Sequence, residues 1–296
     1  MSGLVTVVGT GLMGGGMIRT LLRKGYSVGA YDISRDALDR AARDGAIPYN
    51  SLQEAVLEAD YILLSLPAPQ HVRETVGVIA ETVRAERGVT LIDFSTIDPA
   101  TAKDCAQICE EHGISHLEAP VSGGPQGANN GTLAIMVGGR KETFEQARPL
   151  LEDLGSNVYY LGETGTAALV KLCNNVVVGA TAVALSEAFA LASAGGVPPR
   201  QLAEVLSKSV GGSRTLEVFG RHLIEGDYSS PTFSLGLMHK DLGLFVDTAR
   251  KHGITSLIGN LTYQLYTSAQ RHGWQREDHT VVCRVIEELS GRPIQR

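Results

Sequence analysis

Two polar side chains in one apolar segment have the types and the spacing for proton-transfer chemistry. Lys171 and Asn175 lie four residues apart in a stretch from Gly165 to about Ala194 that has the composition of a single helix. Positions four apart share one face of a helix, so both side chains can reach the same small molecule. A lysine can take and return a proton if its pKa falls toward neutrality, and a carboxamide supplies a neutral donor and acceptor. The alternative for Lys171 is a solvated side chain on the first exposed turn.

A second group of residues has the pattern of a dinucleotide-binding loop. The apolar run Leu4–Val8 predicts a buried parallel strand, and Gly9-Thr-Gly-Leu-Met-Gly14 follows it directly, at the start of a helix. Gly9 permits a tight turn, Gly11 lets a pyrophosphate approach the backbone, and Gly14 lets helix and strand pack closely. The N-terminus of the helix offers free N–H groups to the phosphates.

An acidic residue follows this loop at the distance that a dinucleotide site requires. The segment from Tyr26 ends at Asp32, whose carboxylate can accept both ribose hydroxyls of NAD and would repel the 2′-phosphate of NADP. We therefore expect NAD as the cofactor, with NADP less favoured, although Arg35 can swing toward a 2′-phosphate. The alternative for Asp32 is the N-cap of the next helix, for which Ser34 is better placed.

The elements that must position these residues alternate between strands and helices as far as Gly162. Buried-strand patterns recur at 61–66, 89–94, 114–119, 133–137 and 158–161, and helical patterns at 34–44, 51–59, 69–85, 99–112 and 141–154. Such alternation predicts a doubly wound, mostly parallel sheet, whose ligands lie at the carboxyl ends of its strands. The residues at those ends include Leu66, Pro67, Thr96 and the turn Ser122-Gly123-Gly124.

Only helical patterns follow Gly162, among them 237–252, 257–272 and 277–289. The predicted fold is therefore α/β, with an N-terminal Rossmann-type doubly wound sheet and a C-terminal all-α domain. Residues 1–162 form the expected NAD-binding domain, and residues 163–296 form the expected helical domain for substrate binding and oligomerisation.

The composition of the 296-residue chain excludes several classes of protein. With 43% hydrophobic and 20% charged residues, it has the balance of an ordinary soluble globular protein of one or two domains. A net charge of -6, from 26 basic and 32 acidic residues, argues against nucleic acid, because phosphates demand a basic face. Cys105 and Cys109 are one helical turn apart with no second Cys/His pair nearby, so we expect no metal site. The four cysteines form no disulfide framework.

The apolar runs predict neither a signal peptide nor a membrane span. The first run begins at Leu4 and meets glycine at Gly9. The run after Asn175 is interrupted by Ser186 and Glu187, short of the ~20 apolar residues that a span needs. We expect a cytoplasmic protein without a membrane partner.

With these blocks in order, the chain resembles the β-hydroxyacid dehydrogenase family, which includes enzymes of the 3-hydroxyisobutyrate dehydrogenase type and also tartronate semialdehyde reductase and L-threonate dehydrogenase. The resemblance covers nearly the whole chain. The blocks that carry it are the cofactor loop Gly9–Gly14, the nicotinamide-side segment Asp93–Pro99, the substrate motif Glu118–Gly124 with Gly131–Leu133, the catalytic block Gly162–Asn175 and the late lysine block Lys240–Leu242.

The resemblance implies an oxidoreductase that moves a hydride between NAD(H) and the hydroxyl-bearing carbon of a small β-hydroxyacid, or the matching semialdehyde. It implies that Lys171 is the catalytic acid and base. The implied substrate-binding residues are Ser122, Gly123, Gly124 and Asn175. The implied cofactor-binding residues are Gly9, Gly11, Leu12, Met13, Gly14, Asp32, Leu66, Pro67, Thr96 and Lys240.

Several alternatives stay open. The Ser122–Gly124 turn can serve topology alone, and Lys240 can be a helix-face lysine paired with Asp241. An imine reductase shares this architecture, but its relatives usually lack a lysine at position 171 and favour NADP. A non-catalytic NAD-binding sensor is a further alternative.

The apolar character of the long helical segment also bears on assembly. Residues 176–185 are apolar on every face, which implies burial all round. The helix around Val176–Leu191 has too little polar surface for the outside of a small helical domain. We therefore expect a homo-oligomer, either a dimer or a tetramer.

Overall fold

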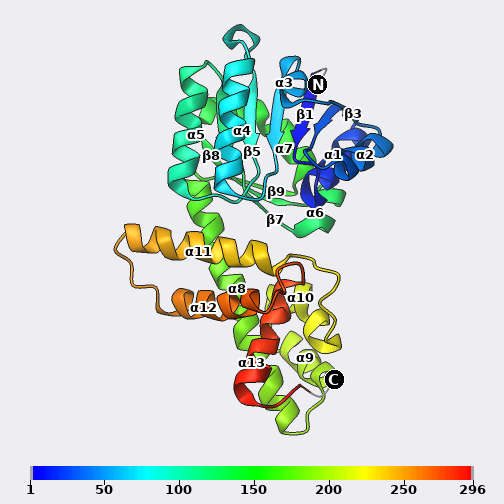
Figure 1. Ribbon diagram of the computed structural model, residues 1–296, viewed down its shortest axis with the longest axis vertical. Helices are drawn as coiled ribbons and strands as arrows, with labels where there is room; N and C mark the ends of the chain where they lie inside the picture. Colours follow the sequence, from blue (N-terminus) through cyan, green and yellow to red (C-terminus); the bar gives the residue numbers. More distant parts are fainter. Residues whose placement is uncertain (1–2, 295–296) are drawn as a thin grey trace. The chain divides into compact units, whose positions relative to one another are not determined.

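The computed structural model describes residues 3–294, and its sheet has the strand order of dinucleotide-binding proteins. Nine strands within those residues run in the order β3-β2-β1-β4-β5-β6-β8-β7, and β9 pairs with β8 (Figure 1). The strands are β1 (Leu4–Val8), β2 (Ser27–Tyr31), β3 (Ile47–Pro48), β4 (Tyr61–Leu64), β5 (Thr90–Asp93), β6 (Ser115–Glu118), β7 (Val121–Ser122), β8 (Ala134–Gly139) and β9 (Asn157–Tyr160). The first six are parallel, in the 3-2-1-4-5-6 order of the doubly wound fold.

Helices cover both faces of this sheet, because successive side chains of a buried strand point to opposite faces. In β4, Leu63 belongs to one apolar core, and Ile62 and Leu64 belong to the other. The first core takes apolar residues from α1 (Leu12–Arg23), α2 (Arg35–Asp44), α6 (Gly124–Asn130) and α7 (Lys141–Leu154). The second core takes them from α3 (Leu52–Leu57), α4 (Pro69–Thr82) and α5 (Pro99–Glu111). Figure 1 shows α4 and α5 side by side on one face.

The predicted doubly wound sheet is confirmed. Its last strands, β7 to β9, do not follow the regular alternation of parallel strands and helices. β8 is antiparallel to both β6 and β7, whereas β9 is parallel to β8. The two-residue strands β3 and β7 and the seven-residue helix α6 are too short to give a periodic pattern in the sequence. Helix α5 has a side-chain cap: Asp98 accepts hydrogen bonds from two backbone N–H groups, and Pro99 is the first helical residue.

The packing divides the chain into two compact units, Met1–Lys171 and Leu172–Arg296. The second unit consists of helices, with a single isolated bridge between Ser234 and Asp278 among its described residues. Its helices are the end of α8 (Thr166–Ala194), α9 (Pro199–Ser207), α10 (Arg214–Glu225), α11 (Leu235–Lys251), α12 (Leu257–Arg271) and α13 (Val282–Ser290), with the short 3₁₀ turn η2 (His279–Val281). Helices α11 and α12 lie side by side (Figure 1).

Helix α8 packs against the other helices of the second unit along part of its surface. The expected burial of residues 176–185 on every face is wrong, because Val177 is 63% exposed and Ala184 is exposed as well. Val183 packs into one apolar cluster with residues of α11, α12 and α13, and Leu185 and Phe189 pack into another with residues of α10. Within residues 3–294, α8 is the helix that has the length and composition to cross a membrane, and 39% of its most apolar window is buried inside the protein. Ser186 does not interrupt it, because its hydroxyl donates to the carbonyl of Ala182 at 2.7 Å.

Candidate active site

The three glycines of the loop after β1 have different structural roles. A Cβ at Gly9, whose φ is +89°, would lie 2.4 Å from the carbonyl oxygen of Ser65, and one at Gly14 would lie 1.9 Å from the carbonyl oxygen of Gly9. These two glycines therefore serve the packing of the protein itself. A Cβ at Gly11 would meet nothing within 4 Å, and no side chain caps α1 at this residue. The space in front of Gly11 and the N–H groups of α1 therefore suit a phosphate-bearing ligand.

Asp32 lies directly after β2 and links that strand to the glycine loop. Its Oδ2 accepts a hydrogen bond from the backbone N–H of Thr10 at 2.6 Å, and its Oδ1 accepts one from the N–H of Ser34 at 2.7 Å. The N-cap of α2 is Ser34, as predicted, because its hydroxyl accepts from the N–H of Ala37. Asp32 is therefore held in a fixed orientation at the carboxyl end of the strand. Its carboxylate has further lone pairs for ribose hydroxyls.

Arg35, the residue that can swing toward a 2′-phosphate, has other partners in the structure. Its Nε lies 3.4 Å from the carboxylate of Asp39, and its Nη1 donates to Asn50 at 3.3 Å. The side chain is mostly exposed, so these contacts are weak.

The residues at the carboxyl ends of β4 and β5 meet, as expected for neighbouring parallel strands. The backbone N–H of Leu66 donates to the hydroxyl of Ser95 at 2.9 Å, and Leu66 also lies beside Gly9. Thr96 follows Ser95 and is half-buried, while Pro67 is exposed. Leu12, at 67% exposure, and the half-buried Met13 lie in the glycine loop itself.

The turn after β7 requires its two glycines. Gly123 has a φ of +130° and Gly124 a φ of +61°, both in the region that L side chains rarely adopt. Helix α6 starts at Gly124 and packs closely on α1, since a Cβ at Gly16 would lie 2.7 Å from the Cβ of Ala128. The Ser122–Gly124 turn is therefore tied to the helix that follows the glycine loop, and its backbone conformation requires glycine at both positions.

Helix α8 is preceded by a glycine, and the side chain that caps it comes from another part of the chain. Gly165, with a φ of +101°, precedes the first helical residue and has no side chain to offer. The carboxylate of Glu118, at the end of β6, accepts hydrogen bonds from the N–H groups of Gly165 at 2.6 Å, Ala167 at 2.9 Å and Ala168 at 3.3 Å. Burial raises the pKa of Glu118, and the three N–H groups act in the opposite direction.

Lys171 and Asn175 occupy the second and third turns of α8, and both are buried. Lys171 is 8% exposed and Asn175 is 3% exposed. The alternative of a solvated Lys171 on an exposed turn is therefore wrong. Because they are four residues apart in one continuous helix, the two side chains project from the same face of α8.

Asn175 and Lys240 share one buried carboxylate in the second unit. Asp241, 2% exposed, accepts a hydrogen bond from Nδ2 of Asn175 at 2.6 Å through its Oδ2. Its Oδ1 lies 2.8 Å from Nζ of Lys240. The Oδ1 of Asn175 accepts from Nδ2 of Asn174 at 3.0 Å, so both ends of its amide are fixed. The pairing of Lys240 with Asp241, raised above as an alternative, is thus present.

Two carboxylates were not predicted as site residues: Glu118 and Asp241. Each is nearly fully buried, and a buried carboxylate needs partners that stabilise its charge. One sequence feature could have indicated Glu118, namely that the helix carrying Lys171 starts at Gly165, which cannot cap it. Asp241 lies in the late lysine block as a possible partner of Lys240, but the sequence gives no sign of its contact with Asn175, which is 66 residues away.

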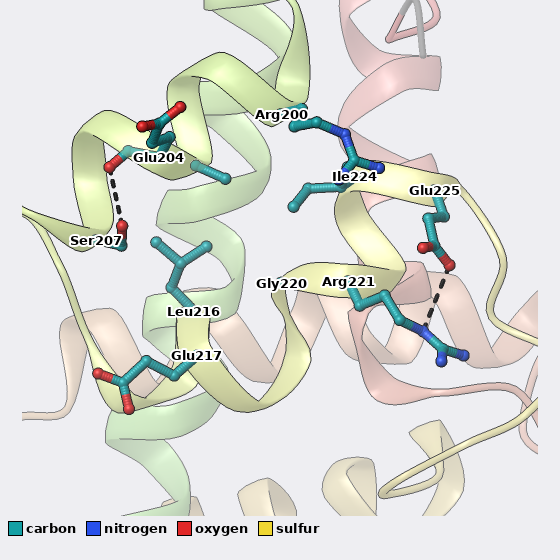
Figure 2. A pocket seen from close by; sticks show the side chains of 10 residues that line it. Arg200, Glu204, Ser207, Leu216, Glu217, Gly220, Arg221, Ile224 and Glu225 are labelled. Carbon is teal, nitrogen blue, oxygen red and sulfur yellow. Dashed lines mark hydrogen bonds and ion pairs between the residues drawn. The ribbon is translucent and has the colours of Figure 1, made fainter.

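The structure also has a cavity that contains none of the predicted site residues. It measures about 340 Å³ and lies between α9 and α10. Figure 2 shows charged side chains of both signs around it, with Arg221 pointing to Glu225 on its own helix. Charged residues of its lining form three ion pairs with near neighbours in the chain, of which only the first lies wholly in the lining: Arg221 with Glu225, Glu204 with Lys208 and Glu217 with Arg214. We therefore assign no chemistry to it.

The two buried cysteines of α5 are unreactive as nucleophiles at neutral pH. Burial raises the pKa of Cys105 and of Cys109 to about 12, so both thiols stay protonated at neutral pH. Among residues 3–294, no group of three or more His, Cys, Asp and Glu side chains could hold a metal ion.

The sheet order, the open glycine and the acid after β2 define a class, the dinucleotide-binding dehydrogenases and reductases. Comparison with known proteins narrows this class. Residues 4–162 match the family model described as the NAD binding domain of 6-phosphogluconate dehydrogenase. Residues 165–286 match the one described as NAD-binding of NADP-dependent 3-hydroxyisobutyrate dehydrogenase.

Similarity to individual proteins extends over the full chain. The probable mitochondrial 3-hydroxyisobutyrate dehydrogenase of Dictyostelium discoideum is 39% identical and the alignment covers 94% of this chain and 89% of the relative. The NAD-dependent L-serine dehydrogenase of Pseudomonas aeruginosa is 34% identical, with 97% and 99% covered. The structure of 3-hydroxyisobutyrate dehydrogenase from Mycobacterium tuberculosis with L-serine has a TM-score of 0.86 at 31% identity, with 97% and 99% covered. The chain belongs to the β-hydroxyacid dehydrogenase family, of the 3-hydroxyisobutyrate dehydrogenase type.

Membership of this family makes the chain an NAD-binding oxidoreductase that acts on a CH–OH group. Imine reductases have a similar fold, at 19–22% identity and TM-scores of 0.64–0.66, and this likeness concerns the fold alone. The imine reductase alternative is therefore not favoured.

Proposed function

We propose that this protein oxidises the primary alcohol of a 3-hydroxy acid with NAD, and that Lys171 is the general acid and base. One observation carries the proposal: Lys171 is buried one helical turn from Asn175, whose amide is fixed by Asp241 at 2.6 Å. A buried amine next to an oriented carboxamide suits proton transfer at a single hydroxyl group.

The names of the relatives support a substrate class. They are dehydrogenases of 3-hydroxyisobutyrate, L-serine and 2-(hydroxymethyl)glutarate. In all three compounds a CH₂OH group is attached to the carbon that bears the carboxylate, and only the third substituent differs. We infer that the substrate of this protein has the form HOCH₂–CHR–COO⁻, with R undetermined.

In the oxidation, the hydroxyl proton must leave as the carbonyl forms. Lys171 accepts that proton and returns it in the reverse direction, which is typically worth ~10²–10⁴-fold in rate. The nicotinamide supplies the hydride chemistry when it is bound. Asn175 orients the substrate oxygen, and the Ser122–Gly124 turn offers backbone N–H groups to the carboxylate.

Activity measurements on a panel of acids test this proposal. The panel contains 3-hydroxyisobutyrate, serine, 2-(hydroxymethyl)glutarate and their semialdehydes, each assayed with NAD(H) and NADP(H). On the best substrate, Lys171→Ala should lower kcat by at least ~10²-fold, and Lys171→Arg should fail as well, since a guanidinium cannot act as a base. Asn175→Ala should raise KM more than it lowers kcat. Lys251→Ala, on the exposed last turn of α11, is the matched control and should keep the wild-type rate.

Two results would contradict the proposal. Near-wild-type turnover of Lys171→Ala would exclude Lys171 as the proton-transfer group. Turnover of secondary alcohols or imines alone, with none of the 3-hydroxy acids accepted, would exclude the substrate class.

We also propose that the protein is at least a dimer of identical chains. Val177, Ala184 and Leu191 are exposed at intervals of seven residues, so they form one apolar stripe on α8. Helix α12 exposes Leu257, Ile258 and Leu261 as well, at 58% or more. Such surfaces usually mark an interface. Light scattering should show a stable oligomer that Val177→Glu weakens; a wild-type monomer at working concentration would contradict this.

A further inference from the structure

The start of α8 is the point where the sheet of the first unit meets the helix that carries Lys171. The first N–H groups of any helix lack partners within the helix, and an N-cap side chain usually satisfies those of its second and third residues. Gly165 cannot do so. Glu118 supplies the missing acceptor from a strand that lies 47 residues earlier in the chain.

The contacts of Glu118 are those of a complete cap. Its Oε1 accepts from Gly165 at 2.6 Å and from Ala167 at 2.9 Å, and its Oε2 accepts from Ala168 at 3.3 Å. Glu118 is 1% exposed, so water does not compete for these bonds. A negative charge at the positive end of a helix dipole adds to the stabilisation.

The carboxylate of Glu118 occupies space that a side chain at Gly138 would fill. Gly138 of β8 is the register partner of Glu118, and a Cβ at Gly138 would lie 2.2 Å from Oε1. The side chain of Lys103 approaches Gly165, and its positive charge favours the ionised form of Glu118. The glycine at position 138 therefore lets the carboxylate reach the first turn of α8.

We propose that Glu118 is a positioning residue, which sets the place of Lys171 relative to the Ser122–Gly124 turn. Ala167, whose N–H donates to Glu118, is four residues before Lys171, so its carbonyl accepts the N–H of Lys171 within the helix. Four residues after Glu118 comes Ser122. One carboxylate thus connects the helix of the proton-transfer group with the turn that suits the substrate carboxylate.

A capping side chain that belongs to the sheet fixes the helix against the sheet, which a cap in the preceding loop cannot do. A serine at position 165 would satisfy the same N–H groups but would move with the helix. Glu118 is part of β6, so it fixes the rotation and the height of α8 against the sheet. Since a displacement of about 1 Å at a reacting group can cost about 10²-fold in rate, this fixation has a kinetic consequence. The inference rests on the proposed role of Lys171.

The experiment compares two variants of Glu118 on the best substrate of the panel. Glu118→Asp keeps the charge but is one methylene too short, and should lower kcat by about 10²-fold. Glu118→Gln keeps an acceptor oxygen for the two shortest bonds and should retain kcat within about tenfold. NADH affinity, followed by fluorescence, should stay within about twofold in both, because its predicted contacts lie at Gly11 and Asp32.

A double variant separates positioning from any other role. If Glu118 acts through Lys171, Glu118→Asp combined with Lys171→Ala should be no slower than Lys171→Ala alone. Multiplied losses would overturn the inference. The matched control is Ser213→Ala, which removes the cap of α10, a helix without any candidate site residue. It should lower the free energy of unfolding by about as much as Glu118→Asp does, without a change in kcat.

Gly138→Ala tests the same positioning role of Glu118 if the Glu118→Asp protein does not fold. Its methyl group displaces the carboxylate without removing the buried charge, so kcat should fall by about tenfold or more while NADH still binds. Wild-type kcat in a folded Glu118→Asp or Gly138→Ala protein would overturn the inference. Loss of the proposed function itself is distinguishable, because Lys171→Ala would then keep its turnover.

Discussion

Asp241→Asn is expected to weaken substrate binding more than turnover. The two oxygens of Asp241 have separate partners, Nδ2 of Asn175 at 2.6 Å and Nζ of Lys240 at 2.8 Å. Asparagine has nearly the same shape but offers one acceptor oxygen and one NH₂ group, so it cannot satisfy both donors. If its oxygen faces Lys240, its NH₂ group faces Nδ2 of Asn175 and the amide of Asn175 loses its acceptor. If its oxygen faces Asn175, that bond is kept but is weaker, because the acceptor is no longer charged.

The size of the effect follows from these contacts. A hydrogen bond to a charged group contributes about 1.5–3 kcal/mol. The side chain of Lys240 keeps 21% exposure, so water replaces part of the lost contact and the lower end of that range applies. We expect the free energy of unfolding to fall by about 1.5–2 kcal/mol. A similar loss in orienting Asn175 would raise KM for the hydroxy acid about tenfold.

Steady-state kinetics at saturating NAD and urea unfolding measure the two quantities. The matched control is Asp247→Asn, on the same helix, where an exposed carboxylate pairs with Arg250 at 3.1 Å. It should leave KM unchanged and the free energy of unfolding within about 0.5 kcal/mol of wild type. A wild-type KM in Asp241→Asn would refute the reasoning. If Asp247→Asn raised KM by as much, the rise would result from the loss of a negative charge and not from the orientation of Asn175.

Three further predictions concern the first unit. Asp32→Ser should lower the preference for NAD over NADP, measured as the ratio of kcat/KM values, by at least ~10-fold, and an unchanged ratio would show that Asp32 does not select the cofactor. Gly11→Ala should fold normally, since its methyl group meets no protein atom within 4 Å, and it should bind NADH more weakly. Gly14→Ala should be unstable, because its methyl group would lie 1.9 Å from the carbonyl oxygen of Gly9. Thermal melts and NADH titrations check both variants. Burial lowers the pKa of His116 from 6.5 to about 4, so the unfolded chain takes up a proton first and stability is lost as the pH falls from about 6.5 to about 4. In urea unfolding, His116→Leu should remove about 2 kcal/mol of the loss between about pH 7 and about pH 5, and an unaltered loss would contradict this assignment.

Much of the fold was predictable because long buried elements have a strong periodic pattern. The strands predicted at 61–66, 89–94 and 114–119 occur as β4, β5 and β6, each a residue or two shorter. The single long helix predicted from Gly165 to Ala194 is α8. Elements of two residues, such as β7, depend on tertiary pairing and leave no local pattern.

The candidate site was predictable where its residues have fixed spacing in the chain. The glycine loop is an example, because strand, turn and helix are consecutive and the requirement at each glycine is local. Lys171 and Asn175 are another, since one helix relates them. The contacts of Asp241 with Asn175 span 66 residues, and those of Glu118 with the start of α8 span 47 to 50. Such contacts depend on the folded chain and not on any spacing in the sequence.

The cap of α8 by Glu118 also bears on the order in which the chain acquires its structure. During synthesis, β6 leaves the ribosome before Gly165 is made, and N-terminal segments generally fold first. The first turn of α8 can be closed only after β6 has joined the sheet, because its acceptor lies there. A contact of this sequence separation is costly in loop entropy and forms late relative to local turns. We therefore expect the capped first turn of α8 to form late in refolding, after the sheet that carries its acceptor.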